Sequence, residues 1–247
     1  MKHIHRFFVT DSLAGGRTVR LEDGDAFHAA RVLRLKAGDA VELADGGGRV
    51  FAAAVTAVDG TVEARVGEML AGADPEAAAR LAVVQALPKG RKLDLVVEKL
   101  AELGVPRLVP VYTDRSAARP QKPGGKFERW GRIARSAAAQ SKSSRIMTVD
   151  QPADLRGWLA EHAGPVVVLS TEAAGEPLGG LAAGLAAGTD APLALVVGPE
   201  AGFSPAELES LRAAGARFAS LGGQVLRTET AALVAAAIVL HRQGRLG

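Results

Sequence analysis

The sequence predicts an α/β protein in which a small β-rich domain precedes a larger domain built on a parallel sheet. Residues 1–70 contain short runs of alternating apolar and polar residues separated by glycine turn signals, as in small barrels. From Arg80 onward, apolar strands alternate with amphipathic helices, which is the order of parallel strands joined by right-handed crossovers. We therefore expect one domain over residues 1–72 and a second over 73–247.

The first domain should contain four short strands and one helix. The helix is expected from Asp25 to Leu33. Phe7 and Phe8 are candidate stacking surfaces for an RNA base, but we expect at least one of them to fill the core. The alternating runs that predict the strands cover residues 17–21, 40–43, 49–55 and 61–66.

The second domain should follow a linker at residues 71–79, which are small and polar. Arg80–Leu87 is expected to form a buried strand, and an amphipathic helix follows from Lys92 to Gly104. The next expected elements are a strand at 108–112, a helix at 127–140 and a strand at 165–169.

The composition excludes several classes of protein. The 247 residues are 48% hydrophobic, which suffices for a sizeable core, and the absence of cysteine excludes disulfides, cysteine zinc sites and thiol catalysis. The amino-terminal sequence lacks the apolar run of a signal peptide. The longest apolar run, Ala231–Leu240, is far shorter than the about 20 residues of a membrane span. We therefore expect a soluble protein, and the absence of cysteine fits the cytoplasm. Because the five histidines are scattered, we expect no metal site.

Positive charge is concentrated in the middle of the chain. Residues 73–150 carry 15 Lys/Arg against 8 Asp/Glu, whereas residues 1–72 carry 9 against 10 and residues 151–247 carry 6 against 9. Between Arg115 and Arg145 there are nine basic residues and one acidic residue. Such clustering is typical of a polyanion-binding surface. A solvated linker or helix face explains the charge alone equally well.

Two strand–loop–helix units between Leu193 and Leu240 carry the candidate chemistry, because open α/β sheets bind ligands at the carboxyl ends of their strands. In the first unit, a strand ends at Val197 and a tight loop, Gly198–Phe203, follows. Ser204-Pro-Ala-Glu207 then predicts a capping box with proline at the first helical position. The spacing matches neither a dinucleotide fingerprint nor a Walker loop, so an ordinary βα turn explains it as well.

In the second unit, a strand at 218–221 leads through two glycines to a nearly all-apolar helix, which should be buried on every face. Thr228 or Thr230 is a natural N-cap of this helix, and Glu229 suits the positive end of its dipole. Capping does not account for Arg227, which is unfavourable there unless it pairs with an anion or with Glu229. Arg227 is therefore the clearest functional signal in the residues themselves.

These two units resemble the last motifs of the RsmE-type methyltransferases of the SPOUT superfamily. The residues that carry the resemblance are Leu195–Phe203 and Leu221–Ala231, and it extends to 6–8, 31–35, 87–104, 115–116 and 130–140. The sequence departs from the family pattern in two places. Ala201 stands where the family usually has a second glycine, and Ala139–Ser143 replaces a Glu-Gln-Ser/Cys-Gly-Arg turn.

The resemblance implies a fold and an activity. The amino-terminal domain would be a PUA-like, RNA-binding β-barrel, and the second domain a SPOUT-type α/β knot with a trefoil-knotted carboxyl end. The cofactor would be S-adenosylmethionine. The reaction would be methylation of N3 of a uridine in 16S ribosomal RNA of the small subunit, by a cytoplasmic homodimer that needs no metal and no membrane.

The motifs also imply site residues. Arg227 would steady the developing uridine anion or a target phosphate, and Glu200 or Glu229 would orient the base. The implied cofactor residues are Leu169, Ser170, Thr171, Gly198, Glu200, Gly202, Leu221, Gly222, Leu226, Arg227, Thr228, Thr230 and Ala231. The residues expected to contact RNA are Arg6, Arg31, Arg34, Lys89, Arg91, Arg115, Arg119, Lys122, Arg129, Arg132 and Gln140.

Three other functions are compatible with parts of the sequence. A SPOUT enzyme could act on a transfer RNA or on a ribose 2′-oxygen, although the amino-terminal barrel and the Thr-Glu-Thr-Ala ending argue against it. A non-catalytic RNA-binding or ribosome-assembly protein would not bind S-adenosylmethionine. A nicotinamide enzyme would need a glycine fingerprint that this chain lacks, and it would not explain the basic segment.

Overall fold

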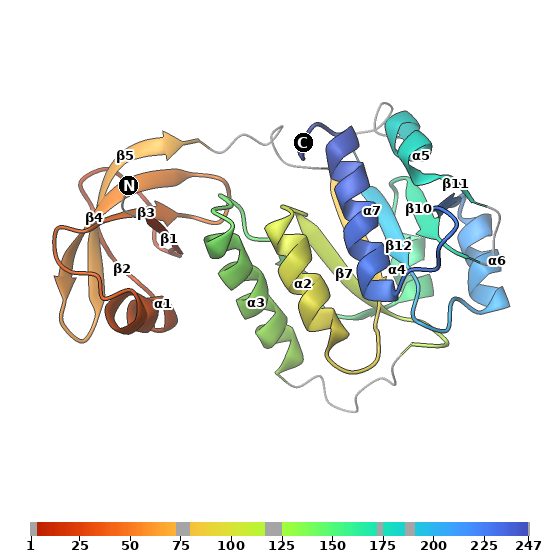
Figure 1. The fold of residues 1–247 in the computed structure, drawn as a ribbon, viewed down its shortest axis with the longest axis horizontal. Coiled ribbons are helices and arrows are strands. Elements are labelled where there is room, and N and C mark those ends of the chain that lie inside the picture. Colours follow the sequence, from red (N-terminus) through yellow and green to blue (C-terminus); the bar gives the residue numbers. More distant parts are fainter. Residues whose placement is uncertain (1–3, 73–79, 117–124, 172–174, 186–190, 247) are drawn as a thin grey trace. The chain divides into compact units, whose positions relative to one another are not determined.

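The computed structural model describes residues 4–72, 80–116, 125–171, 175–185 and 191–246. The chain divides into two compact units, drawn in Figure 1. The first unit comprises Met1–Ala77 and Arg135–Ile146, and the second comprises Ala78–Ala134 and Met147–Gly247. Residues 135–146 thus group with the first unit, although the predicted second domain includes them.

The first unit is a five-stranded mixed sheet folded around its own core. The strand order is β1-β3-β4-β5-β2, in which β1 and β3 are parallel and the other pairs are antiparallel. Buried residues from all five strands meet in one core, as the alternating patterns require. The four predicted strands are confirmed, and β1 adds a fifth. The strands are β1 (His5–Phe8), β2 (Thr18–Arg20), β3 (Ala40–Ala44), β4 (Val50–Val58) and β5 (Val62–Ala71).

The predicted helix of this unit is present but changes its winding partway. Helix α1 (Asp23–Phe27) continues into a π-helical turn, η1 (His28–Val32), in which the Leu33 N–H donates to the His28 carbonyl at 2.9 Å. Its inner side buries Ala26 and Ala29 in the core. Its outer side leaves Phe27 65% exposed.

The second unit is built on a parallel sheet with the order β11-β13-β10-β12-β6-β7-β8, and β9 pairs with β7. The sheet confirms the predicted α/β class. Whether the chain end is knotted stays a prediction. The strands are β6 (Leu81–Ala86), β7 (Arg107–Tyr112), β8 (Thr148–Val149), β9 (Ala153–Asp154), β10 (Val166–Leu169), β11 (Glu176–Pro177), β12 (Leu193–Val197) and β13 (Arg217–Ser220). The helices are α2 (Lys92–Glu102), α3 (Lys126–Gln140), α4 (Leu155–Glu161), α5 (Leu178–Leu185), α6 (Pro205–Ala213) and α7 (Thr228–Arg242).

Helices cover both faces of this sheet. Alternate residues of the central strands, such as Val84 and Val196, pack with α4 and α6 in one core. Because successive side chains of a strand point to opposite faces, Gln85 points the other way, where α2 and α7 pack side by side (Figure 1). Strands β6 and β12 are buried along their whole lengths, as expected at the centre of a covered parallel sheet.

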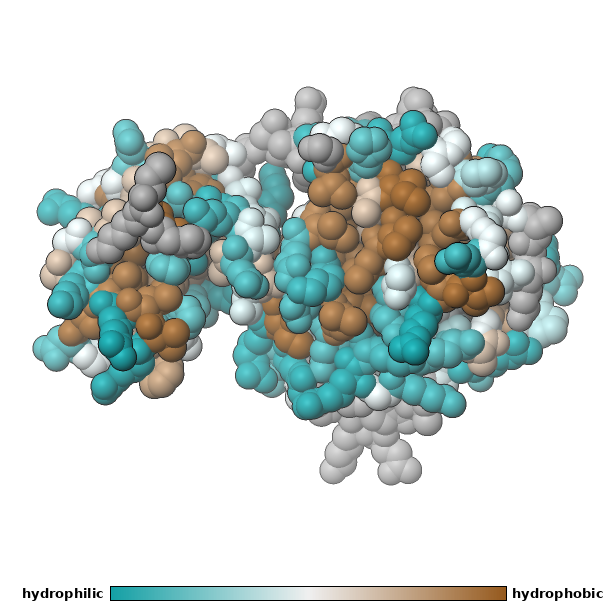
Figure 2. Space-filling view, in the orientation of Figure 1, coloured by the Kyte–Doolittle hydropathy of each residue, from teal (hydrophilic) through white to brown (hydrophobic). Residues whose placement is uncertain are grey.

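The expectation that helix α7 is buried on every face is wrong. Helix α7 is buried on one face only, since Val234 is 38% exposed and Thr230 is also exposed, and Figure 2 shows hydrophobic side chains gathered over this helix. The buried face of the helix consists of Thr228, Ala232, Ala235, Ala236, Val239 and Leu240. Phe7 and Phe8 are both buried, at 3% and 1% exposed, which confirms the expectation that at least one of them fills the core and leaves neither ring available for stacking.

Candidate functional site

A cavity of about 610 Å³ lies at the carboxyl ends of β10, β12 and β13. Its wall is formed mainly by the loops that follow β12 and β13 and by the first turn of α7. This position is the ligand edge of an open parallel sheet, and the volume is within the range of small-molecule sites. The lining residues are Leu169–Thr171, Gly175, Val197–Glu200, Gly202–Phe203, Ala219–Thr228 and Ala231.

Glycine shapes this wall at two positions. At Gly198, an added Cβ would lie 3.0 Å from the ring of Phe203, so a side chain would push the ring out of place. Gly222 has a φ of +115°, which residues with a side chain rarely adopt. Both loops therefore present backbone groups directly to the cavity.

Thr228 joins the parts of the site through its hydroxyl group. The Oγ1 atom donates to the Gly198 carbonyl at 2.6 Å and accepts from Gln85 Nε2 at 2.9 Å. Gln85 is fully buried on β6. The helix α7 is capped differently from the prediction, because Arg227 is the N-cap and no side chain accepts a capping hydrogen bond. Thr228 does not cap because its hydroxyl is already engaged by the neighbouring loop.

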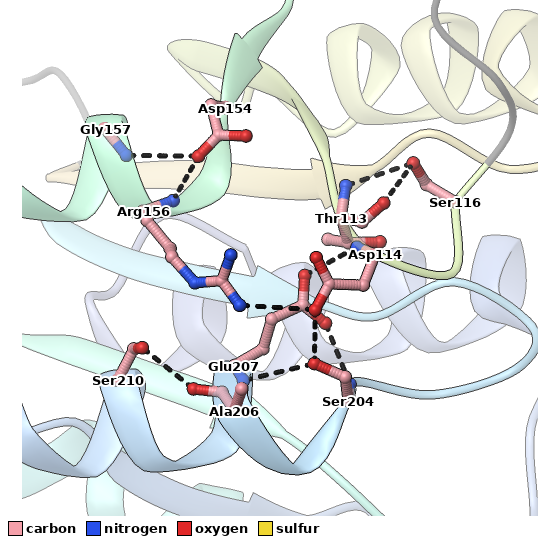
Figure 3. Close-up of polar contacts among 10 residues, drawn as sticks. All are labelled: Thr113, Asp114, Ser116, Asp154, Arg156, Gly157, Ser204, Ala206, Glu207 and Ser210. Carbon is pink, nitrogen blue, oxygen red and sulfur yellow. Dashed lines mark hydrogen bonds and ion pairs between the residues drawn. The ribbon is translucent and has the colours of Figure 1, made fainter.

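A second network fixes the far end of the loop that follows β12, as Figure 3 shows. The predicted capping box is confirmed, since Ser204 Oγ accepts from the Glu207 N–H and Glu207 accepts from the Ser204 N–H. The other carboxylate oxygen of the buried Glu207 accepts from the Asp114 N–H at 2.7 Å. Ser204 Oγ also donates to Asp114 Oδ2, which lies 3.2 Å from Arg156. The hydrogen bond from Ser204 and the charge of Arg156 lower the pKa of Asp114.

Charged groups gather at the edge of the cavity. Lys92 Nζ donates to Glu200 Oε1 at 2.7 Å and lies 3.9 Å from Glu229 Oε2. Burial alone would raise the pKa of Glu200, but hydrogen bonds, chiefly that from Lys92, lower it below its ordinary value. The hydrogen bond with Glu200 raises the pKa of Lys92. Arg227 is exposed on the cavity wall, and its guanidinium has no hydrogen bond or ion pair to any residue that the structure describes.

The structure brings most of the predicted cofactor residues together. All of them except Thr230 line the cavity, and Thr230 lies on the exposed side of α7. Of the three residues expected to act in catalysis, Arg227 and Glu200 line the cavity, whereas Glu229 lies behind it. Sequence reasoning missed Gln85, whose signal was a polar residue inside an apolar strand. It also missed Lys92, which no local pattern distinguishes from other helix-surface lysines.

The residues expected to contact RNA divide between the two units. In the second unit, Lys89, Arg91 and Arg132 are exposed, Arg129 pairs with Asp94, and Arg115 donates to the Ala201 carbonyl at 2.9 Å. Arg119 and Lys122 lie outside the described residues. In the first unit, Arg31, Arg34 and Gln140 are exposed, but the Arg6 side chain is only 11% exposed and pairs with Glu42. That pairing favours a structural role for Arg6.

An exposed aromatic side chain lies near two exposed arginines of the first unit in the sequence. Phe27 and Arg31 are four residues apart in the helical segment, and Arg34 follows just beyond its end; all three are exposed, whereas Ala26 and Ala29 are buried. Arg34 has a φ of +54°, which is uncommon for a residue other than glycine. An exposed phenylalanine close to arginines in the sequence is suited to stack on an unpaired base.

The described residues contain neither a metal-binding cluster nor a membrane-spanning helix. No group of three or more His, Cys, Asp or Glu side chains among them is arranged to hold a metal ion. None of the helices in the described ranges is long and apolar enough to span a membrane.

The family model described as an RNA methyltransferase domain matches residues 75–240, and the model of an RNA methyltransferase PUA domain matches residues 21–66. The ribosomal RNA small subunit methyltransferase E of Mycobacterium bovis is 37% identical over 237 residues, which cover 92% of this chain and 88% of that protein. The chain belongs to the ribosomal RNA small subunit methyltransferase E family. The Synechocystis member is 32% identical over 89% of this chain and 72% of its own length.

Solved structures agree with this membership of the methyltransferase E family. A methyltransferase from Legionella pneumophila with bound S-adenosylmethionine superposes with a TM-score of 0.85 at 27% identity, covering 97% of this chain and 98% of that one. The ribosomal RNA small subunit methyltransferase E from Neisseria gonorrhoeae, bound to S-adenosyl methionine, gives 0.80 at 27% identity with the same coverage. The predicted RsmE-type family and the PUA-like first domain are confirmed.

The hydroxyl of Thr228 should be needed for stability. Thr228→Val leaves the buried Gln85 amide and the Gly198 carbonyl without their partner, and we expect the free energy of unfolding to fall by about 1–3 kcal/mol. Thr230→Val, on the exposed side of the same helix, should change it by less than about 0.5 kcal/mol. Urea unfolding measures both variants, and equal losses would contradict the role assigned to Thr228.

Proposed function

We propose that this chain transfers a methyl group from S-adenosylmethionine to N3 of a uridine in 16S ribosomal RNA. The observation that carries the proposal is the cavity itself, in a chain of the ribosomal RNA small subunit methyltransferase E family. Both motif loops line it, and the exposed Arg227 lies on its wall.

The residues present fit S-adenosylmethionine. The cavity of about 610 Å³ has backbone-lined walls at Gly198 and Gly222, which suit an adenine that hydrogen-bonds to main-chain groups. Glu200 contributes a carboxylate to the same wall, and a carboxylate attracts a cationic ligand such as a sulfonium. We assign the cofactor to the twelve predicted residues that line the cavity and leave Thr230 out. Bound there, the cofactor would supply an electrophilic methyl group.

Preparing the target base for methyl transfer depends on side chains of this protein. Uridine N3 carries a proton and is paired in a duplex, so the target base must be unpaired or flipped and must lose that proton. Arg227 is placed to steady the uridine anion as it develops, or a phosphate of the target. Glu200 lies on the same wall and orients the base.

The proposed partner is the 16S RNA, bound by both units. The second unit offers exposed Lys89, Arg91 and Arg132, and the first offers Arg31 and Arg34 beside the exposed ring of Phe27 in place of Phe7 or Phe8. Backbone phosphates would be held by the cations, and an unpaired base would stack on the ring. The protein would act in the cytoplasm, where ribosomal RNA is made.

We also propose that the chain works as a homodimer. Leu95 on α2 and Val234 on α7 are 43% and 38% exposed, and these two helices pack side by side. An apolar face of adjacent helices in a soluble enzyme is typical of a subunit interface.

The nucleosides of ribosomal RNA test the proposed reaction. In a strain that lacks the gene, mass mapping should show the loss of one 3-methyluridine from 16S RNA, and a plasmid copy should restore it. Persistence of all 3-methyluridine would reject the proposal. Loss of a methylated ribose, or of a methylated transfer RNA nucleoside, would instead support another SPOUT activity.

Arg227 should contribute to turnover. For Arg227→Ala we expect kcat at saturating RNA and cofactor to fall by about 100-fold, because a donor to developing negative charge is removed. Arg212→Ala, which removes an exposed arginine from α6, serves as the matched control and should keep native turnover. Methylation is measured with purified protein and unmodified 16S RNA. Unchanged turnover of Arg227→Ala would contradict its assignment.

A further inference from the structure

Lys92 lies between two carboxylates that belong to different elements. Its Nζ atom donates to Glu200 Oε1 at 2.7 Å, in the loop after β12, and lies 3.9 Å from Glu229 Oε2, in the first turn of α7. Lys92 itself is in the first turn of α2, and its side chain is 37% exposed. A lysine ammonium has three donor hydrogens on a flexible stem, so it can serve either carboxylate.

The second carboxylate is poorly satisfied. Glu229 Oε2 is buried and accepts no hydrogen bond within the described part of the chain. A buried carboxylate oxygen without a donor costs free energy. Lys92 is the cation nearest to it, and about 1 Å of movement would bring the two atoms to hydrogen-bond distance. Arg227 forms no ion pair with Glu229, and its charge repels that of Lys92.

The two carboxylates differ in their access to ligand. Glu200 lines the cavity, whereas Glu229 does not. A target base that enters the cavity therefore meets Glu200 and competes with Lys92 for its oxygens. When Lys92 is displaced from Glu200, its ammonium group can donate to Glu229 instead. Lys92 therefore keeps a carboxylate partner after the exchange.

We infer that Lys92 is a positioning residue that exchanges Glu200 for Glu229 when the target base binds, and thereby releases Glu200 to accept the N3 proton of the uridine. The inference rests on the proposed function. It adds the identity of the general base, Glu200, and of the residue that controls it, Lys92. The N3–H bond breaks, and the proton goes to a Glu200 carboxylate oxygen. The electron pair left on N3 forms the bond to the methyl carbon, while the bond from sulfur to that carbon breaks and its electron pair stays on sulfur. Carboxylate and sulfonium charges are lost together, so the step is balanced.

Glu229→Gln tests the exchange because it keeps the shape of the side chain and removes its charge. Lys92 then stays on Glu200, and we expect kcat to fall by about 10- to 100-fold. The KM for RNA and the calorimetric affinity for S-adenosylmethionine should not change, because Glu229 does not line the cavity. Glu102→Gln is the matched control, since it removes a carboxylate paired with Lys99 at the other end of α2, and it should keep native kcat.

A double-mutant cycle separates this role from a merely structural one. In a Lys92→Gln background there is no lysine to exchange, so adding Glu229→Gln should cause no further loss of kcat. Native kcat in Glu229→Gln, or an equal loss in both backgrounds, would overturn the inference. The kcat of each variant is compared with that of the native protein. If the proposed function is wrong, the native protein itself forms no 3-methyluridine, and this result is distinct from failure of the exchange.

The ligand-free protein gives a readout that does not depend on activity. In Glu229→Gln, Lys92 pairs with Glu200 alone, and the groups that act on the Glu200 carboxylate are Lys92 and the backbone N–H groups of Lys89 and of Glu200 itself. Carboxyl NMR titration should therefore show a lower pKa for Glu200 in Glu229→Gln than in the native protein. Glu102→Gln should leave that pKa unchanged. The same Glu200 pKa in the native protein and in Glu229→Gln would also overturn the inference.

Discussion

The hydroxyl group of Thr228 is the contact on which the candidate site depends. It accepts from Gln85 of the central strand β6 and donates to Gly198 at the end of the adjacent strand β12. One side chain thus fixes the start of α7 against two neighbouring strands. Every other feature of the cavity, from the backbone at Gly222 to the exposed Arg227, is placed relative to that junction. Leaving a buried donor or acceptor unpaired costs free energy, so the hydrogen bonds of the Thr228 hydroxyl with Gln85 Nε2 and with the Gly198 carbonyl stabilise the junction.

The loop after β12 is held at both of its ends. Thr228 fixes it at Gly198, and the network of Ser204, Asp114 and Glu207 fixes it where α6 begins. Between these anchors the loop carries Glu200 to the cavity wall, where Lys92 pairs with it. Glu200 is therefore carried by a loop that is held in place, whereas its ion pair with Lys92 can exchange. This combination suits a reaction in which a proton must leave the substrate at the moment of methyl transfer.

Local signals in the sequence predicted much of this architecture. Alternating runs gave the strands of the first unit, and the capping box at Ser204 placed the start of α6 correctly because all its partners lie within four residues. The same local reasoning predicted that Thr228 or Thr230 caps α7. Nothing nearby in the sequence indicates that the Thr228 hydroxyl would instead bond to Gly198 and Gln85. Lys92 was missed for the same reason, because its partner Glu200 is 108 residues away. Burial also depends on the tertiary neighbours. Phe8 is buried against Ala138 of α3, whereas Phe27 has no such neighbour and stays exposed.

Family membership and cavity geometry are independent observations. Both support the claim that the methyl donor binds at the edge formed by the loops after β12 and β13. A crystal structure of the protein with S-adenosylmethionine tests this claim most directly. We expect electron density for the cofactor between residues 198–203 and 221–228, with no displacement of Thr228 from Gly198. Density for the cofactor elsewhere, with this cavity empty, would contradict it.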